Sequence, residues 1–302
     1  MRMMTFGRAR TLWSRLSRAA TLAIIAAGCG QAASDGPPPL RFSAIPDQNS
    51  TELQEKFQPL ASHLTTALGV VVEYVPARDY QAAVEMFKNG DAPLAWLGGL
   101  TGVQARAAVT GARAIAQGQT DPRFYSYFIA HRDTGLPRSS DFPFGIEGRR
   151  FTFGSRSSTS GRLMPEFFIR ERTGRSAEEL FDGLVGFSGS HDRTIELVAS
   201  GQYDVGAVSY QVFDQRVAEG TVAPDVVRII WQTPIYPDYN WTAHPILDGL
   251  FGEGFIDRLQ QVLVAIDDPT LLSALPRRRL VAASNDEFEN IRVVAETLDM
   301  LR

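Results

Sequence analysis

The stretch Phe151–Phe168, FTFGSRSSTSGRLMPEFF, combines a short strand, a polar loop and the start of a helix. The strand is Phe151–Phe153, and apolar residues recur at helical spacing from Leu163 onward. The hydroxyl triplet Ser158–Ser160 comes where the strand leads into the helix, and each of its residues can serve as the helix N-cap. Free N–H groups at a helix N-terminus and the hydroxyls before it together form an anion site without a metal. A plain N-cap in a serine-rich loop is the simpler interpretation of the triplet alone, and the rest of the chain favours the anion site.

The first 28 residues differ in composition from the rest of the chain. Five arginines precede the apolar run Ala19–Ala27, and this order predicts a signal peptide whose core is too short to span a membrane. Cys29, the only cysteine, directly follows small residues, as in a bacterial lipobox. We therefore expect an exported protein without an internal disulfide, with a lipidated Cys29 as its mature N-terminus. The alternative is an ordinary cleavage site with an incidental cysteine.

The segment after the cysteine is rich in proline, glycine and serine, so residues 29–39 are expected to form a flexible tether. Without the leader, 25 basic and 34 acidic residues remain. This acidic balance argues against a nucleic-acid partner. No further apolar run is long enough to span a bilayer.

Strands and helices alternate from Leu40 onward, which predicts an α/β fold with largely parallel strands. Ligands in such folds bind beyond the carboxyl ends of strands, where helices begin. The corresponding loops in this chain are Pro46–Asn49, Ala77–Tyr80 and Leu97–Thr101.

Two long strands are interpreted as connections between two lobes. The aromatic strand Phe124–Ala130 leads into a second lobe, and Val226–Trp231 leads back. The expected lobes are residues 40–126 with 235–302, and residues 127–234. Two crossings between rigid halves create a ligand cleft that closes about hinges.

Several stretches then occur in the order found in one family. They are RFSAIPDQNS, the loop at Tyr80, PLAWLGGLTGVQA, FTFGSRSSTSGRLMP, GSHDRTIELVASGQYDVGAVSY and IIWQTPIYPDYNW. Over nearly all of residues 40–300 the chain resembles the phosphate, phosphite and phosphonate substrate-binding proteins of ABC importers. Within them it most resembles a branch described as selenate-binding. The resemblance implies a type II periplasmic-binding fold and delivery of the ligand to a membrane permease.

The resemblance also implies ligand-binding residues. Ser158, Thr159 and Ser160 match the Ser-Thr-Ser triplet of the family. Tyr80 matches a tyrosine after the second strand, and His191 matches a histidine that opens a helix in the second lobe. The other candidates for ligand contact are Gln48, Trp96, Leu97, Gln211, Asp238 and Tyr239.

Three positions depart from the phosphonate-binding pattern. Leu97 stands where the family has a tyrosine, and Gln211 lies in the region of a glutamate. Tyr239 stands in the region of an aspartate, although the neighbouring Asp238 restores it with a one-residue gap. Losing a carboxylate argues against an aminoalkylphosphonate. Selenate and sulfate carry no proton, so a site of donors suits them, and a glutamine at position 211 fits such an anion.

No motif supports an enzyme, since HExxH, a cysteine pair, G-x-S-x-G and the P-loop are all missing. A hydrolase built on Ser158 and His191 would lack a third group to orient the histidine. We therefore expect a monomeric substrate-binding protein of an ABC importer, periplasmic or anchored at Cys29, without cofactor or metal. Its partners would be a small oxyanion and an inner-membrane permease. The alternative is a ligand sensor that signals to a membrane kinase.

Overall fold

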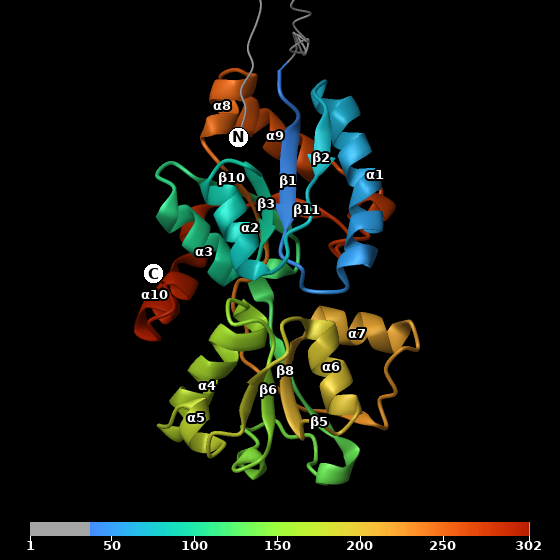
Figure 1. Ribbon diagram of the computed structural model, residues 1–302, viewed down its shortest axis with the longest axis vertical. Helices are drawn as coiled ribbons and strands as arrows, with labels where there is room; N and C mark the ends of the chain where they lie inside the picture. Colours follow the sequence, from blue (N-terminus) through green and yellow to red (C-terminus); the bar gives the residue numbers. More distant parts are fainter. Residues whose placement is uncertain (1–36, 302) are drawn as a thin grey trace, which may run out of the picture. The chain divides into compact units, whose positions relative to one another are not determined.

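The computed structural model describes residues 37–301 (Figure 1). The predicted signal peptide, Cys29 and most of the predicted tether lie outside these residues. None of the helices in this part combines the length and the hydrophobicity that a membrane crossing requires.

The first sheet has six strands in the order β11-β4-β10-β3-β1-β2. Strands β1, β2 and β3 run parallel, whereas β10 runs antiparallel to β3 and β4, and β11 antiparallel to β4. The strands are β1 (Leu40–Ala44), β2 (Val72–Tyr74), β3 (Leu94–Leu97), β4 (Arg113–Gly118), β10 (Asn240–Ala243) and β11 (Leu280–Ala282). The helices packed around this sheet are α1 (Ser50–Leu68), α2 (Tyr80–Lys88), α3 (Gly99–Ala108), α8 (Ile246–Phe251), α9 (Phe255–Val264) and α10 (Glu289–Thr297). We refer to this part of the chain as lobe 1.

The second sheet has five strands in the order β7-β6-β8-β5-β9, and we refer to its part of the chain as lobe 2. Strand β6 runs parallel to β7 and β8, whereas β5 runs antiparallel to β8 and β9. The strands are β5 (Ser126–His131), β6 (Phe151–Phe153), β7 (Val185–Phe187), β8 (Val205–Ser209) and β9 (Val227–Gln232). The helices are α4 (Met164–Thr173), α5 (Ala177–Leu180), α6 (His191–Ala199) and α7 (Tyr210–Ala218).

The two sheets confirm the two-lobed α/β fold, but the expectation of largely parallel strands is wrong. Both sheets are mixed. Strands β5 and β10 each enter a lobe from the other one and run against their neighbours there. Strand β11 is reached from within lobe 1 and also runs antiparallel, to β4. The predicted lobe boundaries at residues 126/127 and 234/235 stay predictions.

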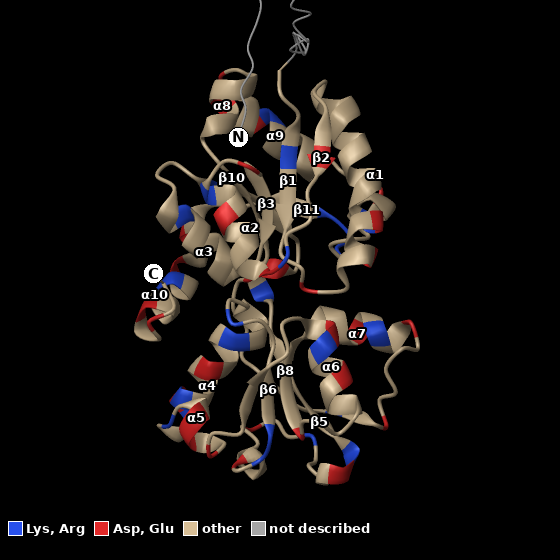
Figure 2. Cartoon of the chain, viewed as in Figure 1, with Lys and Arg blue, Asp and Glu red and all other residues tan. Residues whose placement is uncertain are grey.

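Acidic and basic residues are mixed on several helices and do not form separate patches on them. In the view of Figure 2, helices α4, α6 and α7 each carry acidic and basic residues together. The polar residues that follow the strands into the space between the lobes are mostly buried instead. These buried groups are the candidates for an anion site.

Candidate anion-binding site

The hydroxyl triplet lies between β6 and α4 and is almost fully buried. The Ser158 hydroxyl accepts a hydrogen bond from the Gly161 N–H at 2.9 Å, so Ser158 is the N-cap. The first helical turn, Thr159–Leu163, is a π-helical turn in which the Leu163 N–H donates to the Ser158 carbonyl at 2.9 Å. The N–H groups of Thr159 and Ser160 precede this first helical bond and have no acceptor within the helix.

His191 opens helix α6 and meets the triplet. Its Nε2 lies 3.4 Å from the Ser160 hydroxyl, and its Nδ1 accepts a hydrogen bond from the Ser209 N–H at 3.3 Å. Burial lowers the pKa of His191 to about 4, so the ring is neutral at neutral pH. Because Nδ1 accepts, the proton of the neutral ring sits on Nε2 and points to Ser160. Only glycine fits at Gly161, where a Cβ would lie 3.2 Å from Cε1 of His191 and 2.9 Å from the Ser158 hydroxyl.

The N-terminus of helix α3 in lobe 1 faces the triplet. The Gly99 N–H donates to Oδ1 of Asp238 at 2.8 Å, and the next N–H, of Leu100, donates to the Thr159 hydroxyl at 3.0 Å. The second bond joins the two lobes directly. A Cβ on Gly98 would lie 3.0 Å from the Thr159 hydroxyl and 3.2 Å from Oδ1 of Asp238, so this close approach requires glycine.

Asp238 is fully buried, and its second oxygen, Oδ2, has no hydrogen-bond partner among the described residues. Burial raises the pKa of Asp238 to about 7, and hydrogen bonds from Gly99 and Thr159 limit the rise. The one-residue gap expected from the sequence thus brings Asp238, and not Tyr239, to helix α3. Asp238 can act there as a carboxylate acceptor or, when protonated, as a donor.

Asp47 was not among the candidates from the sequence, although it lies in the loop Pro46–Asn49 after the first strand. Its carboxylate accepts a hydrogen bond from the Tyr239 hydroxyl at 2.8 Å, and its carbonyl accepts one from the His191 N–H at 3.0 Å. Burial raises the pKa of Asp47 to about 6, while the Tyr239 hydroxyl and the charge of Arg277 oppose the rise. The Tyr239 ring stacks on Trp96, with ring centroids 5.6 Å apart.

A buried ion pair lies behind this aromatic pair and was also missed. The Arg277 guanidinium lies 4.7 Å from the centroid of the Tyr239 ring and 5.4 Å from that of Trp96. Its Nη2 donates to Oδ1 of Asp121 at 2.7 Å. No sequence signal marks Arg277, which stands second in a run of proline and arginines.

Other buried hydroxyls in the part that the structure describes lack a partner. Tyr80 is the first residue of α2, and its hydroxyl makes no hydrogen bond there. Burial raises the pKa of this phenol well above its ordinary value, so it stays a donor. The Ser43 and Ser209 hydroxyls are likewise unpartnered. Buried polar atoms in folded proteins normally have partners, so these hydroxyls are candidates for contact with a bound polar molecule.

The remaining candidates are placed differently. Gln48 is buried beside Asp47, and Leu97 is buried at the end of β3. The Gln211 amide donates to the Thr120 hydroxyl at 3.2 Å and to the Tyr210 hydroxyl at 3.1 Å. No hydrogen bond joins Gln211 to the triplet or to His191 within residues 37–301, and its expected ligand contact stays a prediction. The same part of the chain contains no cluster of three side chains suited to a metal ion.

Two lobes with mixed sheets, joined by crossing strands and facing each other across buried donors, define a periplasmic-type solute-binding protein. A family model described as the periplasmic substrate-binding protein of phosphonate ABC transporters matches residues 42–288, and the chain belongs to this family. The chain is 37% identical over 273 residues to the probable ABC transporter phosphite binding protein PhnD1 of Prochlorococcus marinus (strain MIT 9301), covering 88% of this chain and 92% of the relative. It is 28% identical over 261 residues to the phosphate-import protein PhnD of Mycolicibacterium smegmatis (strain ATCC 700084 / mc(2)155), covering 80% and 78%.

A solved structure of PhnD1 from Prochlorococcus marinus (MIT 9301), in complex with methylphosphonate, matches with a TM-score of 0.83 and covers 88% of this chain and 100% of that one. These comparisons confirm the predicted family and fold. Since the family consists of transport proteins, they also confirm that the chain is not an enzyme. They give no support to the selenate-binding branch.

Proposed function

We propose that the protein is the substrate-binding component of an ABC importer for a small phosphorus oxyanion that keeps one proton, either phosphite or methylphosphonate. The family match and the two PhnD1 matches, one named for phosphite and one solved with methylphosphonate, support this substrate class. The protein would act in the periplasm and pass its ligand to an inner-membrane permease. Anchoring through a lipidated Cys29 is part of the proposal and rests on the sequence.

Asp238 is the observation that carries the choice of ligand. A buried carboxyl with one unpartnered oxygen and a pKa of about 7 needs a proton between itself and any anion beside it. A monoanion of phosphite or methylphosphonate brings that proton. Selenate and sulfate bring none, so they would need the protonated form of Asp238, whose share falls as the pH rises above about 7.

Gln211, by contrast, favours a different ligand. A glutamine in place of glutamate at this position predicts a site of donors only, which suits a proton-free anion. Two buried carboxyl groups carry acceptors in this region: Asp238 beside Thr159, and Asp47, whose carboxylate binds the Tyr239 hydroxyl. Acceptors of this kind favour a protonated ligand.

The donors of the proposed site come from both lobes. Lobe 2 supplies the Thr159 and Ser160 N–H groups, the Ser160 hydroxyl and the Nε2–H of His191, and lobe 1 supplies the Tyr80 hydroxyl. Apart from helix dipoles, none of these carries a charge. The stacked Trp96 and Tyr239 rings offer an apolar surface for the hydrogen or methyl group on phosphorus. A fourth oxygen of phosphate would lose its hydration there without a partner.

Titration calorimetry of the purified protein tests the proposal with phosphite, methylphosphonate, phosphate, sulfate and selenate at pH 6 and pH 8. We expect phosphite or methylphosphonate to bind most tightly, with an affinity that falls from the lower to the higher pH. Tightest binding of sulfate or selenate would overturn the assignment. The kinase-sensor alternative is not favoured, because the matched family consists of transport proteins.

A further inference from the structure

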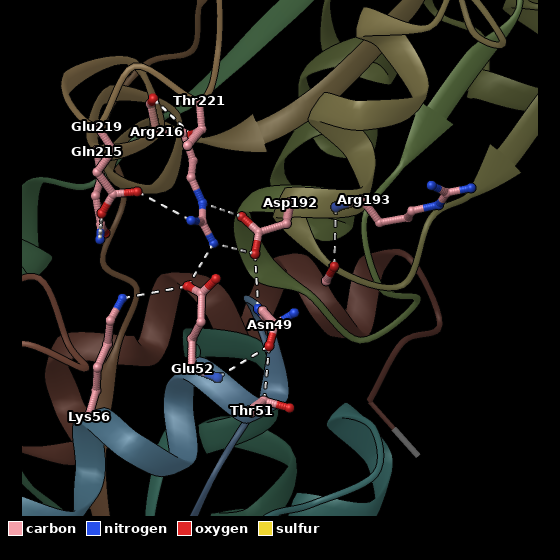
Figure 3. A network of polar contacts seen from close by, with 11 residues as sticks. Asn49, Thr51, Glu52, Lys56, Asp192, Arg193, Gln215, Arg216, Glu219 and Thr221 are labelled. Carbon is pink, nitrogen blue, oxygen red and sulfur yellow. Dashed lines mark hydrogen bonds and ion pairs between the residues drawn. The ribbon is translucent and has the colours of Figure 1, made fainter.

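A network of charged residues connects the lobes outside the proposed ligand site (Figure 3). Arg216 of helix α7 binds Asp192 of helix α6 through two parallel hydrogen bonds, from Nε to Oδ1 and from Nη2 to Oδ2, each 2.9 Å long. The same Nη2 donates to Oε2 of Glu52 in helix α1 at 3.1 Å. Arg216 and Asp192 belong to lobe 2 and Glu52 to lobe 1, so the guanidinium bridges the lobes.

A main-chain bond strengthens the same junction. The Asn49 N–H of lobe 1 donates to Oδ2 of Asp192 at 2.9 Å, while the Asn49 side chain caps helix α1. One residue earlier in α6, the His191 N–H donates to the Asp47 carbonyl. The first turn of α6 is therefore bonded to lobe 1 on one side, and its His191 ring meets Ser160 on the other.

We propose that Glu52, Asp192 and Arg216 form an inter-lobe latch that slows release of the ligand. Arg216 is a positioning residue in this scheme, since it acts through Asp192 and the start of α6 and does not touch the proposed ligand site. The inference rests on the proposed function, because release of a ligand is what the latch would control.

The geometry explains why the latch is efficient. Opening of the lobes breaks the bonds from Glu52 to Arg216 and from Asn49 to Asp192. It leaves the paired bonds between Arg216 and Asp192 intact, since both residues move with lobe 2. The guanidinium is thus held in place in the open protein and loses little further freedom when Glu52 returns. Its side chain is only 14% exposed, whereas that of Glu52 is 42% exposed.

The surroundings also predict how the latch responds to salt. A pocket of about 530 Å³ is lined by Asn49 and Glu52 of lobe 1 and by Asp192 and Arg216 of lobe 2, among others. Solvent ions that enter it screen the bridge from Glu52 to Arg216 more than a fully buried pair. Higher salt should therefore speed release in the parent protein.

The test is Glu52→Gln, which removes the lobe 1 charge and keeps the shape of the side chain. Dissociation of methylphosphonate or phosphite, measured by stopped-flow fluorescence, should become about three- to thirtyfold faster. This range lies between the effect expected for the loss of an exposed ion pair and that for the loss of a buried one. The association rate should change less. Arg216→Lys keeps the charge but loses the fork, so it should fall between Glu52→Gln and the parent.

Glu196→Gln is the matched control. Glu196 lies on the same helix α6 and pairs with Arg193 at 2.8 Å within lobe 2, so its loss removes an ion pair without touching lobe 1. It should release ligand at the rate of the parent. A dissociation rate for Glu52→Gln equal to that of Glu196→Gln, with the same salt dependence as the parent, would overturn the latch.

Binding measurements on the parent protein separate a failure of the ligand assignment from a failure of the latch. If the parent binds neither methylphosphonate nor phosphite, the proposed function fails, and the latch is then tested without ligand. Spin labels on α1 and α7 report the distance between the lobes by electron paramagnetic resonance. Glu52→Gln should shift the distribution to longer distances at low salt, and an unchanged distribution would overturn the latch independently.

Discussion

Asp238 and Thr159 accept hydrogen bonds from two consecutive N–H groups at the start of helix α3, those of Gly99 and Leu100. Asp238 lies in the segment before β10 that returns to lobe 1, and Thr159 belongs to the hydroxyl triplet of lobe 2. The end of one helix therefore holds both the carboxyl that would share a proton with the ligand and a contact that closes the lobes. The Thr159 hydroxyl thus contacts lobe 1 directly, and its predicted ligand contact stays a prediction.

Thr159→Ala should weaken ligand binding because the closed state loses its bond to the Leu100 N–H. Leaving that buried donor without a partner costs about 1–3 kcal/mol, which corresponds to a roughly five- to 150-fold loss of affinity. Thr159→Ser keeps the hydroxyl and should restore most of the affinity in calorimetry. The melting temperature without ligand serves as the control for folding. Equal affinities of the alanine variant and the parent would mean that this bond does not contribute to closure.

Asp238→Asn should remove a pH dependence of stability. The pKa of this carboxyl rises from 3.8 in the unfolded chain to about 7 in the folded protein. Its folded state therefore binds more protons, and stability is lost as the pH rises from about 4 to about 7. The full difference corresponds to about 4 kcal/mol. Urea unfolding of the ligand-free parent should show this loss relative to the asparagine variant, and parallel pH profiles would contradict it.

His191 should stay neutral with its proton on Nε2. Its pKa falls from 6.5 to about 4, so stability associated with the neutral ring is fully present above about 6.5 and is lost as the pH falls towards 4. Nitrogen NMR at pH 6 should show a protonated Nε2 and an unprotonated Nδ1. His191→Gln keeps an amide donor and should retain more affinity for phosphite than His191→Ala. A charged imidazole at pH 6 would exclude the neutral-donor role.

Cys29→Ser tests the proposed anchor. If Cys29 is lipidated, the variant should move from the membrane fraction to the soluble periplasmic fraction of expressing cells. Palmitate labelling should be lost at the same time. The same distribution for variant and parent would favour the ordinary cleavage site.

The local part of the site was predictable because it follows from neighbouring residues. The segment Phe151–Phe168 contains a strand, then hydroxyl residues, then a helix. This order produces an N-cap and free N–H groups whatever the position of the segment in the fold. The place of His191 at the start of a helix was predictable for the same reason, whereas its choice as a site residue rests on the family resemblance. Each of these features depends on a single stretch of chain.

The missed residues depend on pairs that are distant in sequence. Asp47 gains its role from Tyr239, and Arg277 gains its place from Asp121. A local sequence pattern does not predict which carboxylate will contact which distant side chain in the folded protein. Gln211 was singled out because it matches a position of the family. That match does not predict the hydrogen bond that its amide donates to the Thr120 hydroxyl.

The start of helix α3 also has a consequence for how this protein tolerates change. Lobe 1 closes on Thr159 with a backbone N–H, and every amino acid except proline supplies that group at position 100. Substitutions on the outer surface of α3, including any region that meets a permease, can therefore leave the hydrogen bond from the Leu100 N–H to Thr159 unchanged. The constraint falls on Gly98, where a single added methyl group would push the hydroxyl and the carboxylate apart.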